Sequence, residues 1–208
     1  MATQDPYAQG YTKWQQRYAA MPSDAWAFGA APTREVEVGA MIYRELHGAS
    51  PARVLDLGAG DGRNTLFLAA QGFDVLAVDA AVSGLQRLKA RLTAQGSGAT
   101  LVSADLRTFA LPSNVDMLVA SYVIHMLPAP YSFLKQWQAC TRPGGLCIVS
   151  TRGRFADDPP DYWFPDTLAL KHFFEFSGWD IYHAHEEYQR RPDRLFRRTA
   201  VVARKPIE

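Results

Sequence analysis

Hydrophobic and polar positions alternate along this chain with two periods, and together these periods predict alternating strands and helices. Short apolar runs bounded by turn residues are typical of buried strands, whereas apolar residues three or four positions apart indicate helices that bury one face. Strand signals lie at residues 54–57, 74–78, 100–104, 115–120, 146–151, 179–188 and 197–204. Helical signals lie between them, at residues 65–71, 85–92, 130–140 and 166–176.

This alternation predicts an α/β protein with a doubly wound, Rossmann-like sheet that carries helices on both faces. Seven strands are expected, mostly parallel, with a C-terminal antiparallel hairpin because no helix separates the last two. At 208 residues the chain has the length of one domain, residues 1–208. Within it, the aromatic-rich residues 1–34 predict an N-terminal cap over the active site, and residues 35–208 the Rossmann-like core.

Composition narrows the classes of partner. A net charge of +1 gives no general attraction to nucleic acid or to an anionic membrane, so we expect a small-molecule substrate. Cys140 and Cys147 lack the spacing of zinc or redox motifs, which is compatible with a reducing compartment. No apolar run approaches the roughly 18 to 20 residues of a membrane span, and no signal-peptide pattern is present. We therefore expect a cytoplasmic protein; its oligomeric state is left open by the sequence.

The most informative segment is residues 54–65, where a buried strand runs through a glycine-rich turn into a helix. Its small residues let the backbone approach a ligand closely, and the helix start offers unpaired N–H groups. A dinucleotide-binding loop has the pattern G-x-G-x-x-G, but Arg63 stands at the third glycine position, which disfavours an NAD(P)-dependent oxidoreductase. Asp79 ends the second strand about twenty residues further on, where a carboxylate accepts hydrogen bonds from both hydroxyls of a ribose.

Further motifs follow one another along the chain: Val54-Leu-Asp-Leu-Gly-Ala-Gly60, Asp79, Ala104-Asp105-Leu106, Ser121-Tyr-Val-Ile-His125 and Arg142-Pro-Gly-Gly145. In this order they resemble the motifs of the class I S-adenosylmethionine-dependent methyltransferases. The resemblance implies S-adenosylmethionine as the cofactor and assigns residues to each of its parts. It implies Asp56 as an indirect balance for the ammonium, Gly58, Ala59 and Gly60 at the methionine and ribose, Asp79 and Ala80 at the ribose, Asp105 and Leu106 at the adenine, and Ser121 through its backbone. The alternative is that these residues only close turns.

The N-terminal segment resembles the small-molecule branch of that family, which includes tellurite-resistance and thiol methyltransferases. The resemblance rests on Trp14-Gln-Gln-Arg17-Tyr18, Phe28-Gly-Ala-Ala-Pro32 and Gly62-Arg-Asn-Thr65. It implies that this segment folds over the cofactor and the substrate. Arg17 would then reach the cofactor carboxylate, and the substrate pocket would be walled by Tyr7, Tyr11, Tyr18, Trp26 and Phe28. The alternative is a solvated arginine with aromatics packed as a helical cover.

Further candidates follow the fourth and fifth strands, on the side of the sheet where ligands bind in open α/β folds. His125 is the candidate proton acceptor because its ordinary pKa is near 6.5, and Tyr122 beside it is assigned to the substrate. Arg152 and Arg154 are candidates for holding an anionic substrate group, or else for a salt-bridge network with the aspartates of their loop. Trp163, with its aromatic neighbours, is expected to close the pocket.

Three other patterns compete with this interpretation. Tyr131 and Lys135 have the spacing of the short-chain dehydrogenase pair, and His183 with His185 has the alternation of two metal ligands on a strand. We predict no metal site, because no third ligand with suitable spacing is present. The arginines near the expected hairpin tip are interpreted as a solvated edge rather than a nucleic-acid surface; they are residues 190, 191, 194, 197 and 198. The sequence also lacks the Asn/Asp-Pro-Pro and Pro-Cys motifs of nucleic-acid methyltransferases.

The sequence thus predicts direct, in-line transfer of a methyl group to a small-molecule acceptor, whose reacting group is a thiol, oxyanion, amine or hydroxyl. Positioning and desolvation would supply most of the catalysis. The main alternative is a catalytically idle member that binds the cofactor as a sensor or partner module. An NAD(P)-dependent oxidoreductase is the less favoured third reading.

Overall fold

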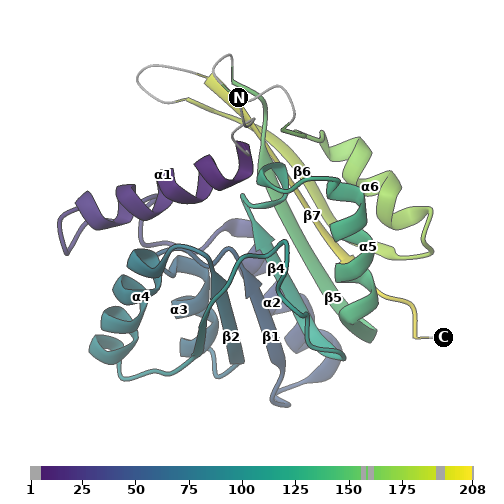
Figure 1. The fold of residues 1–208 in the computed structure, drawn as a ribbon. Coiled ribbons are helices and arrows are strands. Elements are labelled where there is room, and N and C mark those ends of the chain that lie inside the picture. Colours follow the sequence, from purple (N-terminus) through teal and green to yellow (C-terminus); the bar gives the residue numbers. More distant parts are fainter. Residues whose placement is uncertain (1–5, 156–157, 159–161, 191–194, 208) are drawn as a thin grey trace.

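One mixed β-sheet carries the fold of the chain (Figure 1). The computed structural model describes residues 6–155, 158, 162–190 and 195–207, without the side chains of residues 6–9 and 189. The strands are β1 (Arg53–Leu57), β2 (Asp74–Asp79), β3 (Thr100–Ser103), β4 (Val115–Ser121), β5 (Thr141–Arg152), β6 (Asp180–Arg190) and β7 (Leu195–Arg204). The helices are α1 (Pro6–Ala20), α2 (Arg34–His47), α3 (Arg63–Ala70), α4 (Val82–Gln95), α5 (Pro130–Cys140), α6 (Thr167–Glu175) and the short 3₁₀ helix η1 (Ile124–Met126). None of these helices combines the length and the apolar character that crossing a membrane requires.

The strands lie in the order β3–β2–β1–β4–β5–β7–β6. Neighbours from β3 to β5 are parallel, whereas β7 is antiparallel to both β5 and β6. The predicted fold class, a seven-stranded and mostly parallel sheet with a C-terminal antiparallel hairpin, is confirmed. Because β7 lies between β5 and β6, it is an interior strand, although it is the last strand of the chain.

Two local differences from the prediction have clear causes. Helix α3 begins at Arg63 rather than at residue 65, because Gly62 adopts the left-handed conformation, with φ of 97°, directly before it. Strand β5 begins at Thr141 and includes residues 142–145, which were expected to form a turn before the strand. There the N–H of Gly144 donates to the Lys205 carbonyl and the N–H of Lys205 donates to the Gly145 carbonyl, at 3.1 and 2.9 Å. These bonds continue the antiparallel pairing beyond β7.

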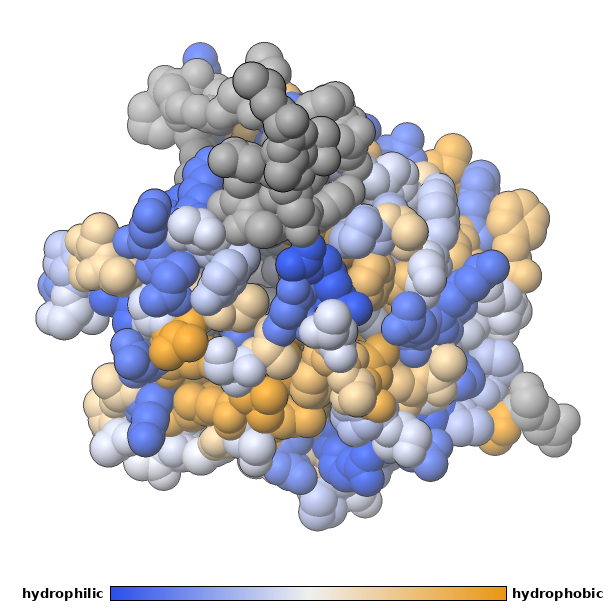
Figure 2. All heavy atoms as spheres, viewed as in Figure 1, coloured by the Kyte–Doolittle hydropathy of each residue, from blue (hydrophilic) through white to orange (hydrophobic). Residues whose placement is uncertain are grey.

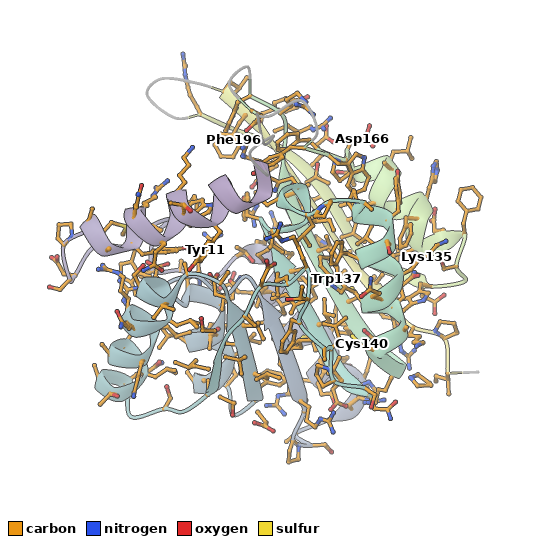
Figure 3. The ribbon with its side chains drawn as sticks, in the orientation of Figure 1. Tyr11, Lys135, Trp137, Cys140, Asp166 and Phe196 are labelled. Atoms are coloured by element: carbon orange, nitrogen blue, oxygen red, sulfur yellow. The ribbon has the colours of Figure 1, made fainter. Side chains whose placement is uncertain are left out.

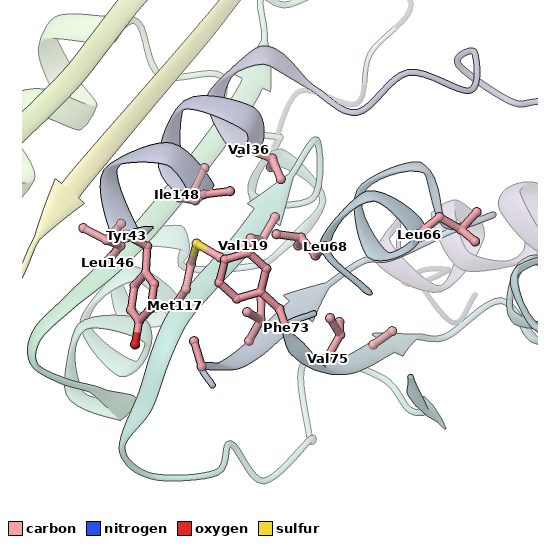
Figure 4. Packing of buried hydrophobic residues seen from close by; sticks show 14 of the residues in the cluster. Val36, Tyr43, Leu66, Leu68, Phe73, Val75, Met117, Val119, Leu146 and Ile148 are labelled. Atoms are coloured by element: carbon pink, nitrogen blue, oxygen red, sulfur yellow. The ribbon is translucent and has the colours of Figure 1, made fainter. Parts of the chain in front are cut away.

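Each face of the sheet buries its own hydrophobic cluster. On one face, residues of α2, α3 and α4 pack on the strands, and on the other face residues of α5 and α6 do so. Figure 4 shows Val36 and Tyr43 of α2 beside Met117, Leu146 and Ile148 of the sheet. Full burial of one such side chain contributes about 1.5–3 kcal/mol. This packing fixes the sheet whose carboxyl edge carries the predicted site.

Residues 104–114 connect β3 with β4 without forming a helix (Figure 1). The segment covers the sheet with side chains that are only partly buried against the second cluster, among them Leu106, Phe109 and Leu111. An apolar band crosses this face of the molecule (Figure 2). The sheet is therefore covered more thinly on this side of β1 and β2 than on the side of α2 and α3.

The N-terminal segment runs across the carboxyl ends of the strands, with α1 packed on α4 (Figure 1). Two arginines of α4 hold the connection between α1 and α2. Arg87 donates to the carbonyl oxygens of Met21 and Pro22 at 3.1 and 2.5 Å, and both Arg87 and Arg91 donate to that of Ala25 at 2.6 Å. Guanidinium groups thus replace the hydrogen bonds that an irregular backbone would otherwise make with water.

A pair of glycines tests how closely the loop before α3 packs on α4. A Cβ at Gly62 would lie 2.2 Å from Leu88 Cδ1 and 3.1 Å from Leu88 Cβ, whereas a Cβ at Gly72 would meet nothing within 4 Å; both residues have positive φ. We expect Gly72→Ala to cost about 1 kcal/mol for the left-handed conformation alone. Gly62→Ala should cost about 1–3 kcal/mol more because of the clash. Urea unfolding measures both, and equal losses would contradict the packing described.

Candidate active site

The loop between β1 and α3 turns sharply at the carboxyl end of the sheet. Gly58 and Gly60 have φ of 72° and 58°, which side chains other than glycine rarely adopt. A Cβ at Gly58 would lie 3.0 Å from Val123, and a Cβ at Gly60 would lie 2.4 Å from the Tyr18 hydroxyl. The two glycines are therefore required both by the backbone conformation and by what packs on them.

The Asp79 carboxylate joins this loop to the end of β2. Its Oδ2 accepts the N–H of Gly60 at 2.8 Å, and its Oδ1 accepts the N–H of Ala81 at 2.7 Å. Burial raises the pKa of the carboxyl above its ordinary value, against the effect of the two N–H donors. Each oxygen keeps acceptor capacity for a further donor, so the group fits the two hydroxyls of a ribose. Ala80, which is half-buried, follows directly.

Most of the loop amides already have acceptors inside the protein. The N–H groups of Gly58 and Ala59 donate to the Val78 carbonyl at 2.8 and 3.1 Å, and that of Gly62 donates to the Ala59 carbonyl at 3.0 Å. Because the N–H of Gly60 is likewise bound to Asp79, all four of these N–H groups have acceptors inside the protein. The loop can therefore let its backbone approach a ligand closely, but a carboxylate of that ligand must be held by side chains or by N–H groups at the start of α3.

Asp56 lies at the base of the loop and is almost fully buried. The Thr65 hydroxyl donates to its Oδ2 at 2.6 Å, while burial raises the pKa of the carboxyl to about 6. The Thr65 hydrogen bond and the charge of Arg63 lower the pKa of the carboxyl against this effect of burial, so the group is mostly charged at neutral pH. A cationic ligand nearby would favour its charged form, as the expected role beside an ammonium requires.

The expected adenine residues lie on the loop after β3. Asp105 is bound at short range by the guanidinium of Arg107, which lowers the pKa of the Asp105 carboxyl. Leu106 is partly buried against the cluster on the α5 side of the sheet. Ser121 ends β4, and its hydroxyl oxygen is buried without a hydrogen-bond partner among the residues that the structure describes.

A column of cations and rings covers the loop from the cap side. Phe28 stacks on Tyr122 with ring centroids 6.1 Å apart and an angle of 11° between the planes, and it also contacts Trp14 at 5.5 Å. The Arg17 guanidinium lies 4.9 Å from the Trp14 ring and 5.4 Å from the Phe28 ring, and that of Arg63 lies 5.5 Å from the Phe28 ring. The structure thus brings Arg17, Phe28 and Tyr122 together, with Arg63 among them.

The other aromatics predicted to wall the pocket are distributed differently. Tyr18 is buried over Gly60, where burial and the charge of Asp79 raise the pKa of its hydroxyl. Trp26 lies against the Arg91 guanidinium, 3.5 Å from it, and Trp163 packs on Tyr131 with centroids 4.6 Å apart. Tyr11 is 43% exposed on α1 (Figure 3), and the Tyr7 side chain is outside the described part of the chain. Trp26 and Trp163 therefore belong to packing on α4 and α5.

His125 lies in η1, directly after β4, and is buried. Its Nδ1 is 3.1 Å from the Thr151 hydroxyl oxygen, and its ring stacks on Phe164 with centroids 5.1 Å apart. Burial, with the charge of Arg152 as a smaller cause, lowers the pKa of the imidazole to about 3. At neutral pH the ring is neutral and only weakly basic, so the position suits hydrogen bonding better than proton abstraction.

Arg152 and Arg154 are both engaged by their own loop. Arg152 donates two hydrogen bonds to the Asp158 carboxylate, at 2.7 and 2.5 Å, and its guanidinium lies 4.8 Å from the Phe164 ring. Arg154 donates to the Tyr162 carbonyl. Of the two roles considered for these arginines, the contacts favour the salt-bridge network for Arg152; Asp157 and Asp161 lie outside the described residues.

The competing patterns lie away from this edge or are paired internally. Tyr131 and Lys135 are on the exposed side of α5, with Lys135 pointing away from the sheet and Trp137 toward it (Figure 3). His183 Nε2 lies 3.0 Å from His185 Nδ1, so the two rings hydrogen-bond to one another. Among the described residues, no group of three potential metal ligands is present.

The interpretation of the hairpin arginines as a solvated edge is wrong for Arg198. This residue is buried and pairs with Glu35 of α2 and, at 3.0 Å, with Glu187 of β6. The reason is the interior position of β7, which places Arg198 under α2 rather than at an edge. Arg197 is half-buried and lies 3.8 Å from Glu186, while residues 191 and 194 are outside the described ranges.

Asp61 is a residue of the site that the sequence analysis missed. Its carboxylate accepts the N–H of Ala27 at 3.0 Å and pairs with Arg91 at 3.0 Å, so it fastens the cap to the loop. The side-chain oxygen of Asn64 likewise accepts the N–H of Thr33, at 2.9 Å. One signal in the sequence could have pointed to Asp61. Arg87 and Arg91 are four residues apart and lie on one face of α4, and two such guanidinium groups need hydrogen-bond acceptors nearby.

The strand order, the sharp loop after β1 and the acid ending β2 together define a Rossmann-like α/β protein that carries a glycine turn and a buried carboxylate at the carboxyl edge of its sheet. Comparison with known proteins adds to this. The methyltransferase domain family matches residues 54–145. The chain is 30% identical over 146 residues to hemagglutinin 1 of Eikenella corrodens, which covers 67% of this chain and 48% of that one. It is 27% identical over 140 residues to the probable S-adenosyl-L-methionine-dependent methyltransferase TehB of Haemophilus influenzae, covering 66% and 49%.

Two solved structures have the same fold. The crystal structure of TehB from Haemophilus influenzae matches with a TM-score of 0.68 and 22% identity, over 86% of this chain and 64% of that one. Magnesium protoporphyrin IX methyltransferase from Synechocystis, solved with bound S-adenosylmethionine, matches with a TM-score of 0.67 and 15% identity, over 97% and 99%. The chain spans about half the length of the curated relatives named above.

The chain is thus similar to S-adenosylmethionine-dependent methyltransferases in residues 54–145 and in its fold. The resemblance inferred from the motifs is thereby confirmed.

The buried imidazole of His125 predicts a pH dependence of stability. Its pKa in the folded state, about 3, lies below the ordinary 6.5, so the unfolded chain takes up the proton first. The contribution is complete above pH 6.5 and is lost as the pH falls below that value. Between pH 7 and pH 4.5 we expect the free energy of unfolding of wild type to fall by about 3 kcal/mol more than that of His125→Gln. Urea unfolding of both proteins at the two pH values measures this difference. The raised pKa of Asp56 acts with the opposite sign in both proteins, and a constant difference between the two proteins would contradict the assignment.

Proposed function

We propose that this chain binds S-adenosylmethionine and transfers the methyl group to a small-molecule acceptor. The observation that carries the proposal is the Asp79 carboxylate, which faces the glycine turn with acceptor capacity left on both oxygens. The family match and the relatives named as S-adenosylmethionine-dependent methyltransferases support it. When bound, this cofactor supplies a methyl group on a sulfonium sulfur, which a nucleophile displaces directly.

Each part of the cofactor has a candidate partner. Asp79 and Ala80 would hold the ribose, Leu106 and Asp105 would lie at the adenine, and residues 58–60 would lie against the ribose and methionine. Arg17 of the cap is suited to the carboxylate because, among the described residues, it makes one hydrogen bond, to the Ala27 carbonyl at 3.3 Å, which leaves most of its donors available. Asp56 would balance the ammonium, as its burial and raised pKa allow.

The residues around the reacting atoms would position and desolvate rather than exchange protons. His125 is held neutral by burial and oriented by Thr151 and Phe164. We propose that it hydrogen-bonds to the acceptor or its loop and does not serve as a general base. The acceptor nucleophile would then be ionised already or lose its proton to water.

A first experiment measures binding of S-adenosylhomocysteine by calorimetry. We expect micromolar affinity in wild type and a loss of about 10- to 100-fold in Asp79→Asn, because the amide keeps only one acceptor for the ribose diol. Asp74→Asn is the matched control, since Asp74 is an exposed acid at the opposite end of the same strand. Binding of a nicotinamide dinucleotide in preference to S-adenosylhomocysteine would refute the proposal.

A second experiment separates an enzyme from a cofactor-binding sensor. Wild type is incubated with S-adenosylmethionine and a panel of thiols, oxyanions, amines and hydroxyl compounds, and release of S-adenosylhomocysteine is followed. We expect turnover on at least one class, with less than about a tenfold fall in kcat for His125→Gln, since general bases contribute about 10²–10⁴. Binding without turnover would favour the idle alternative. A larger fall, with an acidic limb lost from the pH profile, would assign His125 as the base.

A further inference from the structure

The arginines at the carboxyl edge of the sheet differ in how fully their charge is matched. Arg152 is paired with Asp158, Arg198 with two glutamates, and Arg91 with Asp61. Arg17 and Arg63 have no ion pair among the described residues. Each makes a single hydrogen bond, at 3.3 Å, to a cap carbonyl: that of Ala27 and that of Phe28, respectively. These two guanidinium groups are therefore the ones with charge and donors left for a ligand.

Arg63 is held in place by rings rather than by acids. It is half-buried as the first residue of α3, and its guanidinium lies 5.5 Å from the Phe28 ring and 5.6 Å from the Tyr122 ring. Burial lowers the pKa of the group below its ordinary value and outweighs the opposite effect of the charges of Glu35 and Asp61, neither of which forms an ion pair with it in the described structure. Four of its five N–H donors have no partner in the described structure.

The position of Arg63 separates it from the cofactor carboxylate assigned to Arg17. Arg17 stands on α1 beside Trp14, whereas Arg63 faces Tyr122, the residue that follows β4 on the side proposed for the acceptor. Tyr122 is itself fixed in an unusual conformation, with φ of 59° and its N–H donating to the Ser150 carbonyl at 2.8 Å. Its ring is thereby turned toward Phe28 and Arg63. Both guanidinium groups lie over the Phe28 ring, but Arg17 has Trp14 as its second ring and Arg63 has Tyr122.

We propose that Arg63 binds a carboxylate group of the acceptor beside the stacked rings of Phe28 and Tyr122, so that the enzyme selects small organic anions. A planar guanidinium matches a carboxylate with two parallel hydrogen bonds, and the flanking rings suit the apolar body of such a molecule. This inference rests on the proposed methyltransferase function and names its substrate class. It assigns to Arg63 the anion-binding role considered for Arg152, which is neutralised by Asp158.

The test uses two matched pairs of probes, benzoate with benzamide and butyrate with butyramide. Thermal unfolding is followed in the full chain saturated with S-adenosylhomocysteine. We expect at least one carboxylate, at ten times its dissociation constant, to raise the Tm of wild type by about 3 °C or more while its amide does not. The shift should vanish in Arg63→Gln and be partly kept in Arg63→Lys, which preserves the charge without the planar fork.

Two variants control the experiment. Arg44→Gln is the first control. The guanidinium of Arg44 also lies over a ring, 4.3 Å from that of Phe73, and donates to carbonyl oxygens, but it is at the other end of the sheet. The carboxylate should therefore still raise the Tm of this variant. Arg17→Gln should lower the affinity for S-adenosylhomocysteine at least tenfold and leave that for methylthioadenosine, which lacks the carboxylate, unchanged.

The outcomes are distinct. If Arg63→Gln lowers S-adenosylhomocysteine affinity as Arg17→Gln does, Arg63 holds the cofactor carboxylate and the inference is overturned. The absence of a carboxylate-specific shift in wild type, or a shift that persists in Arg63→Gln, also overturns it. Failure of wild type to bind S-adenosylhomocysteine at all would instead refute the proposed function.

Discussion

The carboxylate of Asp79 is the constraint on which the arrangement of this site depends. This one side chain accepts hydrogen bonds from the N–H of Gly60, in the loop after β1, and from the N–H of Ala81, directly before α4. It thereby fixes two neighbouring strand ends relative to one another, in a position where its own burial makes charge costly. Because the remaining acceptor capacity points away from these donors, the same group that shapes the loop is available to a ligand.

A second layer of interactions places the cap over that loop. Arg91 and Asp61 pair at low exposure, and Arg87 satisfies carbonyls of an irregular connection. Buried pairs of this kind are weak evidence for added stability, because desolvation offsets the attraction, but removing one partner is costly. Their effect here is positional: they hold Trp14, Arg17 and Phe28 close to Tyr122. The same applies to Glu35 and Arg198, which join α2 to β7 beneath the site.

The parts of this picture that could be predicted from sequence are those encoded by neighbouring residues. The turn at Gly58 and Gly60 and the acid ending β2 follow from short patterns, and so do the strands and the four helices from α3 to α6, whereas α1 and α2 were not predicted as helices. Pairings between distant residues could not be predicted. Asp61 meets Ala27 across 34 positions, and Arg198 meets Glu35 across 163. Arg198 was misjudged because its environment depends on β7 lying between two other strands, which no local period indicates. Arg63 was noted mainly for breaking a glycine pattern, since its spare donors become visible only once the partners of the neighbouring arginines, such as Arg91 and Arg152, are known.

The interior position of β7 also has a consequence for how the molecule is made. In the pairing of β5 with β7, Leu146 lies opposite Arg204 and Arg152 lies opposite Arg198. The two strands are therefore synthesised some fifty residues apart. Until β7 emerges, β5 and β6 each present an open edge of unpaired backbone groups, the kind of surface through which chains associate wrongly. The sheet is therefore completed only after β7 has been made, and the pair of Arg198 with Glu35, which joins β7 to α2, forms only then.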